Sequence, residues 1–129
     1  MKAGKLAALA ALVVSIAWPS ASFAAGNGCF YSSEFQGWKA PDAKTIYVRV
    51  GLQRYFRLDL GNSCPALLWP DTHLITTVTG SNLICHPVDW DIKLGQSGGG
   101  GGIVGACIVS KMTELTPQDV AAIPPKFKP

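Results

Sequence analysis

Four widely spaced cysteines limit the fold of this chain more than any other feature of its sequence. They stand at positions 29, 64, 85 and 107, and none forms the Cys-x-x-Cys pattern of a zinc knuckle or a thioredoxin-type redox pair. An even number of cysteines in a small exported domain indicates two disulfides. Three connectivities are possible. We expect Cys64–Cys85, which would stabilise a local hairpin, and Cys29–Cys107, which would join the first strand to the last.

The N-terminus has the pattern of an export signal. Lys2 and Lys5 precede an uncharged apolar run over residues 6–16, and Ser22-Phe23-Ala24 places small residues at the two positions that signal peptidase recognises. The apolar run is about half as long as the roughly 20 residues that a membrane-spanning helix needs. The sequence therefore predicts a signal peptide over residues 1–24 and a periplasmic or secreted protein.

The remaining residues, 25–129, are predicted to form a single disulfide-bridged β domain without an integral membrane span. Lys2 and Lys5 account for two of the eleven lysines and arginines, so that nine basic and eight acidic side chains remain. This near-neutral balance, with no basic run or patch, predicts that the protein does not bind nucleic acid. We expect it to be a monomer.

The clearest secondary-structure pattern is a β-hairpin. Residues 44–50 and 54–60 alternate apolar and polar side chains, and residues 51–53 form a three-residue loop between them. Because neighbouring side chains point to opposite faces of a sheet, the loop length decides which residues are paired. The pattern predicts a buried face with the pairs Ile46–Leu58 and Val48–Phe56, and an outer face with the pairs Tyr47–Arg57 and Arg49–Tyr55.

A second hairpin is predicted where residues 72–79 and 82–86 flank Gly80-Ser81, a pair suited to a type II′ turn. Beyond Pro87, residues 88–94 predict a half-buried strand. Its inward face would carry Val88, Trp90, Ile92 and Leu94.

The last third of the chain predicts a strand and a helix. Residues 103–112 are apolar on both faces, which is typical of a central, covered strand. The glycine-rich residues 97–102 before it predict a strand connector, because a phosphate-binding loop would lead into a helix. Thr116 and Pro117 predict the start of a short helix that ends near Ile123. We therefore expect an all-β fold, a small antiparallel barrel or curved sandwich of five to seven strands with a short C-terminal helix.

Few residues suggest chemistry. In the second hairpin His73 and His86 would share a face with Asp71, as in a metal site with two histidines and one carboxylate. Apolar neighbours on that face favour ordinary surface histidines. Asp89 and Asp91 would point the same way on a strand, but a solvent face predicts no catalytic role. We predict no catalytic, metal-ligating or cofactor-binding residue, and no cofactor.

The tryptophans are the candidate binding residues. Trp90 is predicted to lie in the core. Trp38 or Trp69 would make a good binding anchor if exposed, although small cores also use tryptophan heavily.

Short motifs that include all four cysteines follow one another along nearly the whole of residues 25–129. They are Cys29-Phe30, Gly37-Trp38, Thr45-Ile46-Tyr47-Val48, Tyr55, Leu58 to Leu60, Cys64-Pro65-Ala66-Leu67, Ile84-Cys85, Asp89-Trp90, Cys107-Ile108 and Leu115-Thr116-Pro117. Their order resembles a family of small exported proteobacterial proteins that is known only as a domain of unknown function. This resemblance implies a Gram-negative envelope protein with two structural disulfides and no assigned catalytic residue.

Together these patterns predict a non-enzymatic periplasmic β protein that binds another protein or an envelope component. The alternative is a small metal-binding or hydrolytic protein that uses His73 and His86. A clustered histidine and carboxylate pocket would favour the alternative, and an exposed apolar patch would favour the binding module.

Overall fold

The computed structural model describes residues 28–98 and 100–129, so the predicted signal peptide lies outside the described residues. The strands are β1 (Phe30–Tyr31), β2 (Phe35–Asp42), β3 (Thr45–Val50), β4 (Arg54–Leu60), β5 (Thr72–Val78), β6 (Leu83–Ile84), β7 (Trp90–Gln96), β8 (Gly102–Cys107) and β9 (Val109–Glu114). The helices are the α-helix α1 (Pro117–Ala122) and the short 3-10 helices η1 (Ser32–Glu34), η2 (Pro65–Leu68), η3 (Pro87–Asp89) and η4 (Pro125–Phe127).

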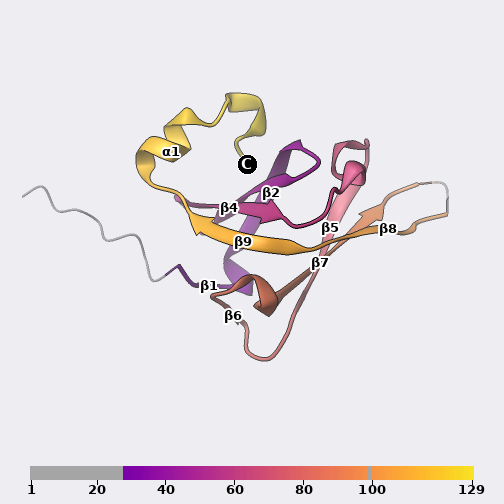
Figure 1. Cartoon of the computed structure of the whole chain (residues 1–129), viewed down its shortest axis with the longest axis horizontal. Coiled ribbons are helices and arrows are strands. Elements are labelled where there is room, and N and C mark those ends of the chain that lie inside the picture. The colour runs from indigo at the N-terminus through magenta and orange to yellow at the C-terminus, as the bar shows by residue number, and fades with distance from the viewer. Residues whose placement is uncertain (1–27, 99) are drawn as a thin grey trace, which may run out of the picture.

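The strands form three antiparallel sheets, ordered β2-β3-β4-β9, β5-β7-β8 and β1-β6. Figure 1 shows β8 and β9 as one continuous band, in which the chain leaves the three-stranded sheet and joins the four-stranded one. The predicted all-β class with a short C-terminal helix is confirmed, although the sheets do not close into a barrel. Of the nine strands in the described part of the chain, β1 and β6 have only two residues each.

The first predicted hairpin is β3–β4, and its register is the expected one. Ile46 lies opposite Leu58, and Val48 lies opposite Phe56. All four side chains are fully buried, and the two tyrosine–arginine pairs lie on the other face as predicted. The loop begins at Gly51, whose φ of 58° is in the left-handed region that favours glycine.

The second predicted hairpin is wrong, because β5 pairs with β7 instead of residues 82–86. In the observed register Leu74 faces Leu94, and Val78 faces Trp90. These four side chains pack in or against the core, so the long-range pairing buries more apolar surface than a local hairpin would.

Two further expectations fail near the exposed surface. Residues 103–112 do not form one covered strand, since Ile108 interrupts them and is itself exposed. Val88 does not lie on the inward face of a strand, because Pro87 begins the 3-10 helix η3 instead. Both errors come from treating an apolar side chain as a buried one, although isolated apolar residues are common on protein surfaces.

Both predicted cysteine pairings are also wrong, although all four cysteines are disulfide-bonded. Cys29 is bonded to Cys85, and their Cα atoms are 4.2 Å apart. Cys64 is bonded to Cys107, with Cα atoms 5.9 Å apart. The expected Cys64–Cys85 bond depended on the second hairpin, which does not form. The observed bonds instead join the residue before β1 to the residue after β6, and the loop after β4 to the end of β8.

One aromatic cluster connects all three sheets. Phe30 of β1 lies 4.9 Å from Phe56 of β4 and 5.5 Å from Trp90 of β7, measured between ring centroids. Phe35 of β2 adds a fourth ring, 5.9 Å from Trp90. The predicted burial of Trp90 is therefore confirmed.

The C-terminal helix begins as predicted. Thr116 Oγ1 accepts a hydrogen bond from the Asp119 N–H at 3.2 Å, and Asp119 Oδ2 accepts one from the Thr116 N–H at 3.1 Å. The helix α1 ends at Ala122, before the Pro124-Pro125 pair. The glycine-rich segment connects β7 to β8, as expected.

Candidate functional site

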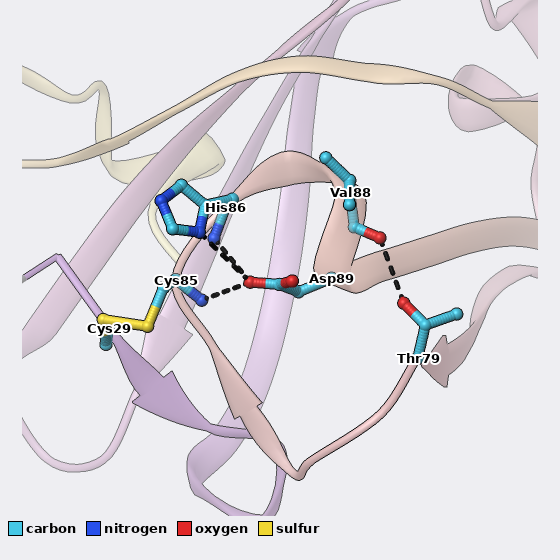
Figure 2. Close-up of polar contacts among 6 residues, drawn as sticks. All are labelled: Cys29, Thr79, Cys85, His86, Val88 and Asp89. Carbon is cyan, nitrogen blue, oxygen red and sulfur yellow. Dashed lines mark hydrogen bonds and ion pairs between the residues drawn. A yellow bond between two sulfur atoms is a disulfide. The ribbon is translucent and has the colours of Figure 1, made fainter.

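The turn that contains η3 is organised by one carboxylate (Figure 2). Asp89 Oδ2 accepts hydrogen bonds from the backbone N–H of Cys85 at 3.0 Å and of His86 at 2.8 Å. These two hydrogen bonds stabilise the ionised carboxylate and so lower the pKa of Asp89 below its ordinary value. The bond from Cys85 has the larger effect. The His86 ring lies on the same side, with its Nδ1 3.5 Å from Asp89 Oδ2.

Two further bonds hold this turn against the rest of the protein. Cys85 is disulfide-bonded to Cys29, and Thr79 Oγ1 donates to the Val88 carbonyl at 3.0 Å. The backbone of Val88 is therefore fixed, while its side chain points away from the Asp89 carboxylate in Figure 2.

A second organised turn separates β8 from β9. The Asn62 side chain donates to the Ala106 carbonyl at 3.1 Å and accepts from the Ile108 N–H at 2.8 Å. The Gly61 N–H donates to the Ile108 carbonyl at 2.8 Å. The backbone polar groups of Ile108 are thus satisfied by the loop after β4, which leaves its side chain directed to solvent.

A groove opens between these two turns. The ladder between β7 and β8 ends at the pair Ile92–Cys107, yet both chains continue and diverge, one toward η3 and the other into β9. The space between them has a volume of about 670 Å³. We call it the β9 groove; its lining includes His86, Val88, Trp90, Asp91, Cys107, Ile108, Val109 and Ser110.

The β9 groove has a buried floor and an exposed apolar rim. Trp90, Cys107 and Val109 are buried beneath it, whereas Val88 is 79% exposed and Ile108 is 66% exposed. Isolated exposed apolar side chains are ordinary, but Val88 and Ile108 line the same groove, and exposed apolar side chains that gather in one place are typical of binding surfaces.

A smaller groove of about 450 Å³ borders the opposite edge of the four-stranded sheet. It lies where β2, η2 and η4 meet, and it differs from the β9 groove by its lysines. We call it the β2 groove; its lining includes Trp38, Lys39, Leu67, Leu68, Lys126 and Phe127.

The structure does not bring the two histidines together. His73 lies opposite Gly95 near one end of β7, and its ring is 3.3 Å from Ser97 Oγ. His86 precedes η3, beyond the other end of β7. The five residue steps of β7 from Gly95 back to Trp90 alone span about 17 Å, so the two histidines lie beyond reach of one metal ion. The described residues contain no group of three or more histidine, cysteine, aspartate or glutamate side chains that could hold a metal ion.

The two aspartates are separated as well. Asp89 caps η3, whereas Asp91 lies in β7 with its Oδ2 3.1 Å from Lys93 Nζ. They do not form a carboxylate pair of the kind that acid–base catalysis uses.

The tryptophans have three different environments. Trp90 is in the core, Trp38 is half-buried in the β2 groove, and Trp69 is 48% exposed immediately after η2. The two candidate anchors therefore both lie near the β2 groove.

Sequence reasoning missed Val88, Ile108 and Asn62. The sequence does contain a signal for the exposure of Val88. At the start of α1 a proline follows the capping residue and an aspartate stands three positions after it, and His86-Pro87-Val88-Asp89 has the same pattern. Asn62 and Ile108 are 46 residues apart, so their hydrogen bond has no local sequence pattern.

Comparison with known proteins adds no relative. No protein family, no curated protein and no solved structure matches this chain. The resemblance to a family of exported proteobacterial proteins therefore stays a prediction. Within residues 28–98 and 100–129, no helix is long and apolar enough to cross a membrane.

Proposed function

We propose that this protein is a non-enzymatic binding module of the bacterial envelope, and that the β9 groove binds an extended segment of a partner protein. The observation that carries the proposal is that the exposed side chains of Val88 and Ile108 line the same groove. Burying each of these side chains against a partner would contribute about 1–2 kcal/mol.

The end of the β7–β8 ladder favours an extended partner. β9 is the last strand of its sheet, so one of its edges is free of strand partners among the described residues. The groove follows this strand at Val109 and Ser110. A peptide that lies here in extended conformation could form main-chain hydrogen bonds with β9 and place apolar side chains against Val88 and Ile108.

The disulfides support this proposal. Cys107 lies in the groove floor, and the Cys29–Cys85 bond holds the turn that carries Val88. A surface that is already ordered loses less conformational entropy on binding. Two disulfides in a small domain also fit an extracellular or periplasmic protein.

The test uses photo-crosslinking residues in place of Val88, Ile108 and, as a control, Leu52, which is exposed in the β3–β4 loop. We expect one envelope protein to crosslink at positions 88 and 108 but not at 52. With that protein purified, Ile108→Asp should weaken binding about tenfold, and Leu52→Asp should leave it unchanged. Equal crosslinking at all three positions, or unchanged affinity for Ile108→Asp, would contradict the proposal.

We also propose export to the periplasm of a Gram-negative bacterium, with export based on the signal pattern and the Gram-negative envelope on the resemblance to exported proteobacterial proteins. Intact-mass measurement on the envelope fraction should show loss of residues 1–24 and of four hydrogens for the two disulfides. A protein that retains these residues in the cytoplasmic fraction would overturn this assignment.

A further inference from the structure

Two lysines on the β2 groove have no acidic partner. Lys39 comes from β2 and Lys126 from η4, and both are exposed. In the described part of the chain neither forms an ion pair with a carboxylate. Lys126 Nζ instead lies 4.7 Å from the centroid of the Phe127 ring. Two positive charges thus stand at one groove, and among the described residues no carboxylate oxygen lies within 4.0 Å of either lysine nitrogen.

The remainder of this groove is largely apolar. Trp38, Leu67, Leu68 and Phe127 line it together with the lysines, and none of the residues that line it is acidic. Leu67 and Trp38 pack in or against the core, so the apolar lining is supported from beneath. The β9 groove differs, because its lining includes Asp91.

We propose that the β2 groove is a second docking surface, and that its occupant is an acidic protein segment in which aspartate or glutamate alternates with apolar residues. The carboxylates would lie near Lys39 and Lys126, and the apolar side chains would contact Trp38 and Leu68. This inference goes beyond the proposed function, since it concerns a different surface and a partner of different charge.

The charge pattern favours this occupant over a nucleic acid. A nucleic-acid site neutralises several phosphates along the backbone, whereas this groove offers two cations. An alternating segment that lies along β2 fits better, because Trp38 and Lys39 are consecutive residues of that strand and lie on opposite faces. An extended chain likewise places its carboxylates on one face and its apolar side chains on the other.

The first experiment compares three hexapeptides, (Leu-Glu)3, (Leu-Gln)3 and (Leu-Lys)3, by NMR titration of the 15N-labelled protein expressed from its full-length gene. We expect (Leu-Glu)3 to shift the amide signals of Lys39, Leu68 and Lys126 and to bind more weakly as salt is raised. The other two peptides should bind at least about fivefold more weakly. Equal shifts with all three peptides would overturn the inference.

The second experiment reverses the two charges. Lys39→Glu combined with Lys126→Glu should weaken (Leu-Glu)3 binding by roughly fivefold to tenfold. Lys44→Glu combined with Lys111→Glu makes the same change in net charge at two exposed positions that do not line the groove, so this double variant is the matched control and should change binding little. An equal effect of the control would show that only net charge matters and would refute the site. Shifts at Val88 and Ile108 concern the proposed function alone, so the two proposals fail separately.

Discussion

The two outer strands of the four-stranded sheet, β2 and β9, differ in how well their outer edges could pair with an added strand. β2 carries Pro41, which has no N–H to donate, and its register against β3 shifts twice. β9 has one register shift, near Ser110, and beside it the chains diverge to form the β9 groove. One edge is therefore poorly suited to the addition of a further strand. The other has no strand partner among the described residues, and η3 lies beside it.

Each of these edges is bordered by a 3-10 helix, but the chemistry of the two borders differs. η2 and η4 give the β2 groove apolar side chains and Lys126, and β2 itself adds Lys39. η3 gives the β9 groove Val88, which lines it together with Ile108. One sheet thus has lysines in the groove along one edge and exposed apolar side chains in the groove along the other. Substitutions in the disulfides and turns would reveal whether the two surfaces depend on different bonds.

The largest effect is expected from the Cys64–Cys107 disulfide, because Cys64 directly precedes η2 and Cys107 lines the β9 groove. Replacing both cysteines with alanine should cost about 4 kcal/mol for a sequence separation of 43 residues. Urea denaturation measures this loss, and peptide titration should show weaker binding at both grooves.

The matched control removes Cys29–Cys85, which has a separation of 56 residues. The cost should be similar, about 4 kcal/mol, but the binding change should be confined to the β9 groove. If this variant impaired the β2 groove equally, the two surfaces would not be independent.

These disulfides also show where prediction from sequence stopped. The β3–β4 register and the start of α1 were predictable because the necessary residues lie within a few positions of one another. The β5–β7 pairing and the two cysteine pairs join distant residues, and the sequence offered a plausible local hairpin in their place.

The candidate site was less predictable than the fold. The Val88 side chain was assigned to a buried face because its spacing matched that of Trp90 and Ile92. Its exposure depends on the cap formed by Asp89, and the exposure of Ile108 accompanies hydrogen bonds with Asn62. Burial was predicted from the spacing of apolar residues alone. That spacing would be the same with or without these hydrogen bonds, so it could not reveal the exposure of Val88 and Ile108.

The next largest effect concerns the C-terminal end of β9. Glu114 is 9% exposed and its Oε1 lies 2.7 Å from Arg54 Nε, while Arg54 also donates to the Cys29 carbonyl at 2.9 Å. Arg54→Met would leave the buried carboxylate without a cation and should cost about 2–3 kcal/mol in urea denaturation.

Arg57→Met on the same strand is the control, because its ion pair with Asp59 is much more exposed. Its cost should be within about 1 kcal/mol. Equal costs for the two variants would mean that β9 is not held by the Glu114 pair.

A smaller loss is expected at the turn between β8 and β9. Asn62→Ala removes the side-chain hydrogen bonds with Ala106 and Ile108, together with a longer one to Cys64 Sγ, and should cost about 2 kcal/mol, with weaker binding at the β9 groove only. Asn62→Asp keeps the acceptor for the Ile108 N–H and should cost less. Asn82→Ala, at an exposed position outside both grooves, controls for the loss of an amide. If Asn62→Ala behaved like this control, Ile108 would owe its position to other contacts.

The smallest effect is a dependence of stability on pH that comes from η3. The pKa of Asp89 is lower in the folded protein than its ordinary value of 3.8, because the N–H groups of Cys85 and His86 stabilise the carboxylate. Its stabilising contribution is therefore complete above pH 3.8 and is lost as the pH falls through the lower, folded pKa. With Asp89→Asn, the free energy of unfolding in urea should fall less steeply as the pH is lowered from 5 to about 2. Asp91→Asn removes one negative charge without touching the turn and serves as the control. If both variants gave the same curve, the carboxylate of Asp89 would contribute charge alone, and the rim of the β9 groove would not depend on its hydrogen bonds.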